Sequence, residues 1–326
     1  MRPLPLAALT ALAATACTVG LPFMPLPDAA PSSSPSGVAG SPVTTGASIG
    51  PVDLPPGSET TVCFHVRLDN PAPIYVTHFT TDLAPGSHHL IFYKSTRTDY
   101  GDANTDSGVG GAFYPCAPFS QTFSRDERPL LIVEKPHDEL TLPDGVAFRL
   151  DAHQMVRLEA HYINSTTLPV QGRGTVTLSG IVAGGPNQPI EANLGFWGTT
   201  RINVPPMSTG DTGVHFERGY TDTNVFAVTT HQHRFGTRMR IWSGGSSGPP
   251  IADTTNWQEP PLYRLDPALH FDGNSGLSYR CEWSNPTALP IRFGESALEE
   301  MCFLWLYYYP SHGFDFCVDG SCVVSE

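Results

Sequence analysis

Basic side chains are scarce in this sequence. Only 18 of the 326 residues are Lys or Arg, against 31 Asp or Glu, so the formal net charge at pH 7 is −13. A protein that binds nucleic acid needs a basic surface to neutralise the phosphates. The composition therefore predicts no nucleic-acid partner.

The sequence also lacks long helical periodicity and long apolar runs. Its 31 Gly and 32 Pro separate short runs rich in Val, Phe, Thr and Tyr, a pattern typical of β-strands joined by turns. The apolar run near the N-terminus is too short to span a bilayer, and no later run is long and apolar enough. The sequence predicts an all-β protein whose length leaves room for two domains.

The first 50 residues differ in composition from the rest. Arg2 precedes a short apolar run, and residues 14–17, Ala-Thr-Ala-Cys, resemble the lipobox of bacterial lipoproteins. We therefore expect a signal peptide over 1–16 and a lipidated Cys17, with simple secretion as the alternative. Residues 17–50 are rich in Pro, Ser and Gly, which predicts a disordered linker. The expected location is the cell envelope, at the outer membrane or cell surface, with membrane contact only through the lipid.

Six cysteines follow the predicted linker. Cysteines of an exported protein lie in an oxidising compartment, where they form disulfides. An even number predicts three bridges, although the sequence alone permits 15 pairings. The six residues are Cys63, Cys116, Cys281, Cys302, Cys317 and Cys322.

Three segments place histidines where they could bind a metal. His231 and His233 lie in a strand-like run, where residues i and i+2 point to the same face. His88 and His89 follow a Pro-Gly turn, and both could reach one metal only if the backbone is irregular or bulged. His161 lies in an alternating run, on the phase opposite to the core residues. Hydrogen-bonded surface histidines would give the same patterns.

Six short segments together resemble the type II copper, ascorbate-dependent monooxygenases. That family includes dopamine β-monooxygenase and peptidylglycine α-hydroxylating monooxygenase. The segments occur in the family's order and at similar spacing, and they cover roughly residues 52–310. They are CFHVRL (63–68), HHLIFY (88–93), LPDGVAFRL (142–150), RLEAHYIN (157–164), VFAVTTHQH (225–233) and EEMC (299–302).

The resemblance implies two jelly-roll-like antiparallel β-sandwich domains side by side. We place the N-terminal domain at residues 51–184 and the C-terminal domain at residues 185–326. Each domain would bind one copper, and a solvent-filled cleft would separate the two mononuclear sites. The positions that match the family's ligands are His88, His89 and His161 in the first domain, and His231, His233 and Met301 in the second.

The donor types agree with copper. Imidazole binds copper well, and the thioether of Met301 would select Cu(I) over zinc or magnesium. A zinc hydrolase would present a carboxylate or a third histidine in place of Met301, and core packing is the alternative role of this residue. The resemblance implies that the three-histidine copper stores and delivers an electron. Catalysis is assigned to the site of His231, His233 and Met301, with ascorbate or another external reductant as co-substrate.

The resemblance also implies two of the disulfides, Cys63–Cys116 and Cys281–Cys302. Cys317 and Cys322 follow the matched region. The Asp-Gly turn between them suits a short closed loop, and an intermolecular bridge is the alternative.

Three positions depart from the peptide-processing members of the family. An Arg, an Asn and a Tyr hold the substrate carboxylate there, and the corresponding residues here are Thr229, Phe303 and Trp305. These side chains share strand faces with the ligands of the second site. They predict a pocket for a small apolar or aromatic substrate and a poor fit for a carboxylate. Arg234, Arg238 and Arg240 are expected on the opposite face unless a bulge intervenes.

The sequence thus predicts a copper-dependent monooxygenase that hydroxylates a C–H bond of a small molecule with O₂ and an external reductant. A non-catalytic copper-binding surface lipoprotein, serving as carrier or sensor, is the alternative because the same ligands support it. A structural β-sandwich with vestigial sites is a third possibility. All six ligand positions carry a suitable residue type, which argues against that third reading.

Overall fold

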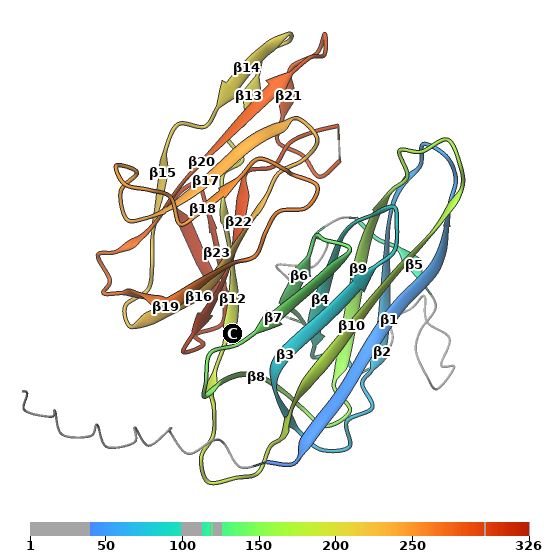
Figure 1. Ribbon diagram of the computed structural model, residues 1–326, viewed down its shortest axis with the longest axis vertical. Coiled ribbons are helices and arrows are strands. Elements are labelled where there is room, and N and C mark those ends of the chain that lie inside the picture. Colours follow the sequence, from blue (N-terminus) through green and yellow to red (C-terminus); the bar gives the residue numbers. More distant parts are fainter. Residues whose placement is uncertain (1–39, 99–112, 118, 120–125, 297, 326) are drawn as a thin grey trace, which may run out of the picture. The chain divides into compact units, whose positions relative to one another are not determined.

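The chain folds into β-sheets joined by turns and loops (Figure 1). The computed structural model describes residues 40–98, 113–117, 119, 126–296 and 298–325. These residues form 24 strands and no helix, so the predicted all-β fold is confirmed. No helix that could cross a membrane is found among them. The predicted signal peptide, Cys17 and the linker up to residue 39 lie outside the described residues.

Residues 42–191 form two sheets, drawn from blue to green in Figure 1. The strand order is β1-β10-β3-β8-β11 in one sheet, with β7 paired to β3, and β5-β2-β9-β4-β6 in the other. Their strands are β1 (Pro42–Leu54), β2 (Glu59–Arg67), β3 (Ile74–Leu83), β4 (Ser87–Ser95), β5 (Tyr114–Pro115), β6 (Glu127–Val133), β7 (His137–Thr141), β8 (Val146–Leu150), β9 (Met155–Ile163), β10 (Val170–Val182) and β11 (Ile190–Glu191).

Residues 193–325 form the other sheets. The largest has the order β19-β16-β22-β12-β23-β24, the next has the order β14-β20-β17-β18 with β15 on β20, and β13 pairs with β21. Their strands are β12 (Asn193–Gly198), β13 (Asn203–Val204), β14 (Ser208–Asp211), β15 (His215–Arg218), β16 (Thr223–His231), β17 (Gly236–Ser243), β18 (Ala252–Thr254), β19 (Tyr263–Phe271), β20 (Gly276–Asn285), β21 (Ile291–Arg292), β22 (Phe303–Tyr309), β23 (Phe314–Val318) and β24 (Ser321–Ser325).

Two of the predicted boundaries need correction. Strand β1 begins at Pro42 and pairs along β10, so the predicted linker over 17–50 extends too far. Exposed and less exposed positions alternate along most of β1, and Ala47 and Ile49 are buried against the core. Among the described residues the sheets divide between β11 and β12, beyond the predicted boundary at residue 184, because β11 still pairs with β8.

One apolar core continues from the first group of sheets into the second. Leu131 on β6 belongs to the same cluster of buried side chains as Phe196 on β12 and Trp305 on β22. The backbone N–H of Ile132 donates a hydrogen bond of 3.2 Å to the Tyr307 hydroxyl. Burial of apolar side chains away from water lowers the free energy of the folded protein, so these side chains pack together here. The implied solvent-filled cleft is therefore absent where these side chains pack, and the division into two domains stays a prediction.

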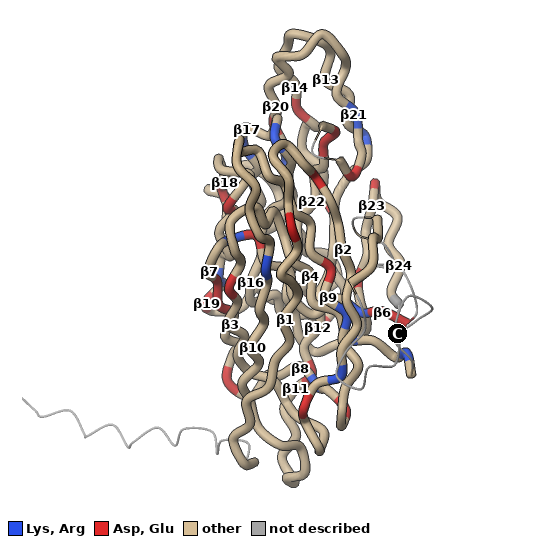
Figure 2. Tube along the Cα trace, turned by 90° about the vertical axis from the view of Figure 1, so that its right-hand side faces the viewer, with Lys and Arg blue, Asp and Glu red and all other residues tan. Residues whose placement is uncertain are grey.

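Acidic positions outnumber basic ones along the described chain, and many basic positions lie close to acidic ones (Figure 2). Arg238 and Asp253 form an ion pair at 2.6 Å, and Arg280 and Asp211 form one at 3.0 Å. These ion pairs neutralise part of the positive charge within the fold.

Candidate metal centre

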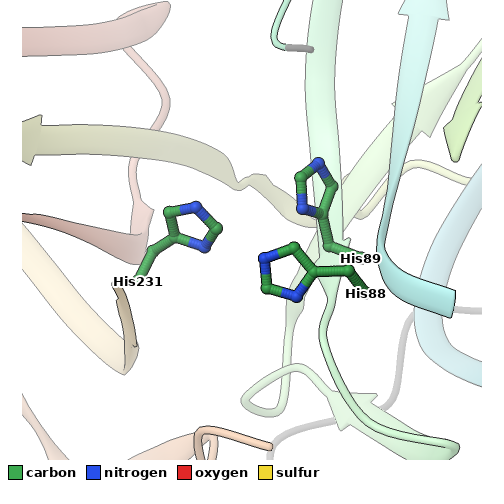
Figure 3. A group of neighbouring side chains, drawn as sticks. All are labelled: His88, His89 and His231. Atoms are coloured by element: carbon green, nitrogen blue, oxygen red, sulfur yellow. The ribbon is translucent and has the colours of Figure 1, made fainter. Parts of the chain in front are cut away.

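Five histidines from both groups of sheets converge in one buried cluster. The ring centroid of His88 lies 5.1 Å from that of His89, 5.3 Å from His161, 5.8 Å from His231 and 5.9 Å from His233. In Figure 3 the ring of His231 points toward those of His88 and His89 from the opposite side. The structure thus brings together all five histidines that the sequence singled out as ligands.

A bulge at the start of β4 places two neighbouring histidines in the cluster. The register between β4 and β9 shifts between Ser87 and His89. The preceding Gly86 has φ +86°, a left-handed conformation that glycine adopts readily. As a result His88 and His89 do not point to opposite faces of a regular strand, and each ring lies within 5.3 Å of the His161 ring. The condition for both rings to reach one metal, an irregular backbone, is therefore met.

His231 and His233 meet by a different route from the one expected. Strand β16 ends at His231, so the same-face rule for strands does not extend to His233. His233 begins a turn in which its carbonyl accepts a hydrogen bond of 2.9 Å from the N–H of Gly236. The two rings nevertheless lie 5.3 Å apart.

Glu300 holds this turn beside the segment that carries Met301. Its buried carboxylate accepts hydrogen bonds from the backbone N–H of His233 at 3.0 Å and of Phe235 at 2.7 Å, and from the Trp283 indole at 2.9 Å. Burial raises the pKa of Glu300 to about 7. Met301, the next residue, is 3 % exposed and lies in the apolar core, so its role as a ligand stays a prediction.

Each of the five histidines has a buried ring nitrogen without a hydrogen-bond partner in the structure. Buried polar atoms are normally hydrogen-bonded, so this concentration points to a missing partner. Burial lowers the pKa of His231 and of His233 to about 3, and the neutral rings that result are the form that binds a metal. The atoms are His88 Nε2, both ring nitrogens of His89, His161 Nδ1, His231 Nε2 and His233 Nε2.

Three acceptors outside the cluster orient the rings. Nε2 of His161 is hydrogen-bonded to Glu59 at 2.9 Å, which leaves Nδ1 for a metal. Nδ1 of His231 is hydrogen-bonded to Glu134, and Nδ1 of His233 to the carbonyl of Glu299 at 3.1 Å, so Nε2 is left in each ring. Metal-binding histidines commonly donate their second N–H in this way. The residues present therefore fit a metal.

The two donor sets are adjacent rather than separated. Potential ligand atoms of His88, His89 and His231 all lie within 4.8 Å of one another. Two of these residues belong to the set expected in the N-terminal domain and one to the set expected in the C-terminal domain. The expected separation across a cleft is not found, because the shared apolar core holds the start of β4 against the end of β16.

The three residues predicted to line a substrate pocket are buried in the core. Thr229 pairs with Trp305 across β16 and β22. The rings of Trp305 and Phe303 pack against Phe196, with centroids 4.1 and 4.4 Å apart. Phe119 covers the same face, with its ring 6.3 Å from that of Trp305. These aromatic side chains occupy the space that the predicted pocket would need.

A cavity of about 290 Å³ opens beside the cluster instead. Arg234, expected on the opposite face, lies here because the strand alternation stops at His231. The ring of Trp257 also lines the cavity, 5.4 Å from the ring of His88. The lining residues are Ser87, His88, Ile163, Ser165, Arg234, Trp257 and Gln258.

All three expected disulfides are present. One of them, Cys281–Cys302, joins β20 to the residue that follows Met301 and thereby restrains that segment. His65, by contrast, has no ring nitrogen left for a metal, because Nε2 is hydrogen-bonded to Glu127 at 3.0 Å and Nδ1 to the Tyr114 hydroxyl at 3.1 Å. The bridges are Cys63–Cys116, Cys281–Cys302 and Cys317–Cys322.

A comparison with known protein families found a match over the region that carries three of the predicted metal ligands. Residues 210–322 match the family described as copper type II ascorbate-dependent monooxygenase, C-terminal domain. The matched region contains His231, His233 and Met301 together with the disulfide at Cys302. Over these residues the chain is similar to the copper type II ascorbate-dependent monooxygenases.

Proposed function

We propose that this protein is a copper-dependent monooxygenase that hydroxylates a C–H bond of a small substrate. The reaction converts R–H, O₂, two electrons and two protons into R–OH and water, with ascorbate or another external reductant as the electron source. One observation carries the proposal: five buried imidazoles with unpartnered nitrogens meet beside the segment of Met301.

The residues divide into two ligand sets. We assign His88, His89 and His161 to one copper, and His231, His233 and Met301 to the other. Bound copper would supply one-electron redox chemistry and O₂ activation, and the thioether would favour Cu(I) at its site.

The surrounding residues would prepare these ligands. Glu59 holds Nδ1 of His161 toward the cluster, and Glu134 does the same for Nε2 of His231. Burial of the rings excludes bulk water from the place where the substrate would react. The cavity beside His88 offers a small molecule a route to the cluster.

We further propose that the protein acts outside the cytoplasm. Its three disulfides suit an oxidising compartment. Lipidation at Cys17 would attach it to a membrane, and O₂ and a small molecule would be its partners.

Copper analysis combined with O₂ uptake tests this function. The copper-loaded protein is mixed with ascorbate and a panel of small molecules under ¹⁸O₂, and products are screened by mass spectrometry. We expect substrate-dependent O₂ uptake and one labelled oxygen atom in the product. The control is the His231→Ala/His233→Ala variant, which should give neither. Stable copper binding without O₂ uptake or labelled product would contradict the proposal and favour a carrier or sensor.

A further inference from the structure

We propose that the cavity beside His88 binds a small planar organic anion, with its ring against Trp257 and its acidic group at Arg234. This inference rests on the proposed function for the reaction that follows binding. The anion site itself is defined by the residues that line the cavity, and it can be tested without turnover.

Arg234 provides the positive charge. It is an exposed residue that lines the cavity, and no Asp or Glu is among the described residues of the lining. Ion pairs hold the nearby Arg238 with Asp253 and Arg240 with Glu282, whereas none of the ion pairs between described residues includes Arg234. A guanidinium without a carboxylate partner recognises planar anions through paired N–H donors.

This charge stands out because the chain as a whole is acidic. With a formal net charge of −13, the protein repels anions at long range. An anion that reaches the cluster therefore needs a local cation, and Arg234 is the charged side chain that the cavity presents. It directly follows His233, so an anion held there lies close to the metal-binding turn.

Trp257 provides a flat wall. Its ring is partly exposed and meets the ring of His88 edge-on, at an angle of 72° and a centroid distance of 5.4 Å. A planar ligand can stack on an indole with a gain beyond simple area burial. Ile163 adds apolar surface, and Ser87 and Ser165 add hydroxyl groups.

The size of the cavity favours a small ligand. A volume of about 290 Å³ is at the lower end of the range for ligand pockets. Two kinds of molecule share the required chemistry: an aromatic carboxylate that serves as substrate, and the enolate anion of ascorbate that serves as reductant. Both combine a flat ring with delocalised negative charge.

Anaerobic titration calorimetry of the full-length, copper-loaded, reduced protein tests the anion site. The probes are phenylacetate and its neutral isostere phenylacetamide. We expect phenylacetate to bind about tenfold more tightly, as a hydrogen bond to a charged group allows. Arg234→Gln should abolish this preference, and Trp257→Ala should weaken both probes. Arg238→Gln is the matched control and should keep the preference, because Arg238 is paired with Asp253.

A second titration identifies the source of the anion. If ascorbate displaces phenylacetate and itself loses affinity in Arg234→Gln, the cavity takes the reductant. If ascorbate does not compete and phenylacetate stimulates O₂ uptake, the cavity takes the substrate. Both results support the anion site. Equal affinity for phenylacetate and phenylacetamide, or anion binding that is unchanged in Arg234→Gln, would overturn it. Binding is measured without O₂, so the anion site can be judged from the binding data even if the monooxygenase assay fails.

Discussion

Glu134, the residue after β6, is hydrogen-bonded to Nδ1 of His231, the last residue of β16. The two residues are 97 positions apart, and they belong to different groups of sheets. A carboxylate on one ring nitrogen fixes which tautomer the histidine adopts. The first group of sheets therefore helps to shape a ligand carried by the second.

This relationship predicts that Glu134→Ala weakens copper binding at the His231 site by about 10–100-fold. Glu134→Gln should retain most of the affinity, because its amide oxygen can still accept from Nδ1–H. Competition with a Cu(I) chelator measures both values. Glu139→Ala, at an exposed position on β7, is the control and should leave affinity unchanged. Equal affinity in Glu134→Ala and the native protein would refute the positioning role.

Met301 can be tested by a substitution that preserves volume. Met301→Leu removes the sulfur and should cost less than about 1.5 kcal/mol of folding stability. We expect it to lower Cu(I) affinity at the site of His231 and His233 and to abolish O₂-dependent turnover. The three-histidine site should keep its copper. X-ray absorption of the Cu(I) protein should lose its sulfur scatterer. Should Met301→Leu bind Cu(I) and turn over like the native chain, the residue serves packing alone.

The bridge beside Met301 should support both folding and copper binding. Replacing Cys281 and Cys302 together by Ser should lower the free energy of unfolding by about 2–5 kcal/mol and weaken copper at the Met301 site. Denaturant titration and Cu(I) competition measure the two effects. The control is the double Ser variant of Cys317 and Cys322, whose bridge spans a sequence separation of only 5, against 21 for the first. A Cys281/Cys302 variant that keeps native copper affinity would show that the bridge does not hold the ligand.

A buried acid away from the cluster predicts a pH effect on stability. Burial raises the pKa of Asp315 to about 7, and the Trp197 indole donates a hydrogen bond of 2.8 Å to it. Its folded pKa exceeds its unfolded pKa, so it stabilises the fold at low pH and loses this contribution as pH rises from about 4 to about 7. The native chain should therefore lose about 1.4 kcal/mol per pH unit relative to Asp315→Asn within this window. Denaturant titrations at pH 5 and pH 7 measure the difference, and a value that does not change with pH would contradict it.

Local patterns were sufficient to predict several parts of the site. The Pro-Gly turn before His88 allowed an irregular backbone, and β4 has a bulge at this point. All three disulfides expected from the cysteine count and the family resemblance are present. These features depend mainly on neighbouring residues or on residue types that can be read from the sequence.

Other parts depend on packing between distant segments, which a local pattern does not record. Glu59 and Glu134 were not predicted, because no spacing relates them to His161 and His231. Trp305 was assigned to a pocket, but its ring packs against Phe196. Alternation along a strand shows which face a side chain points to, but not whether another side chain covers that face. Arg234 was expected on the opposite face of a regular strand, but it lines the cavity because β16 ends three residues earlier, which the sequence does not show.

The number of copper ions per chain tests the central claim most directly. Metal analysis should find two copper ions in the native protein, one in His161→Ala and one in the His231→Ala/His233→Ala variant, because each donor set is proposed to hold its own copper. His270→Ala, at an exposed position on β19, should keep both. A single copper ion per native chain that is lost in both variants, or zinc at full occupancy, would contradict the two-site account.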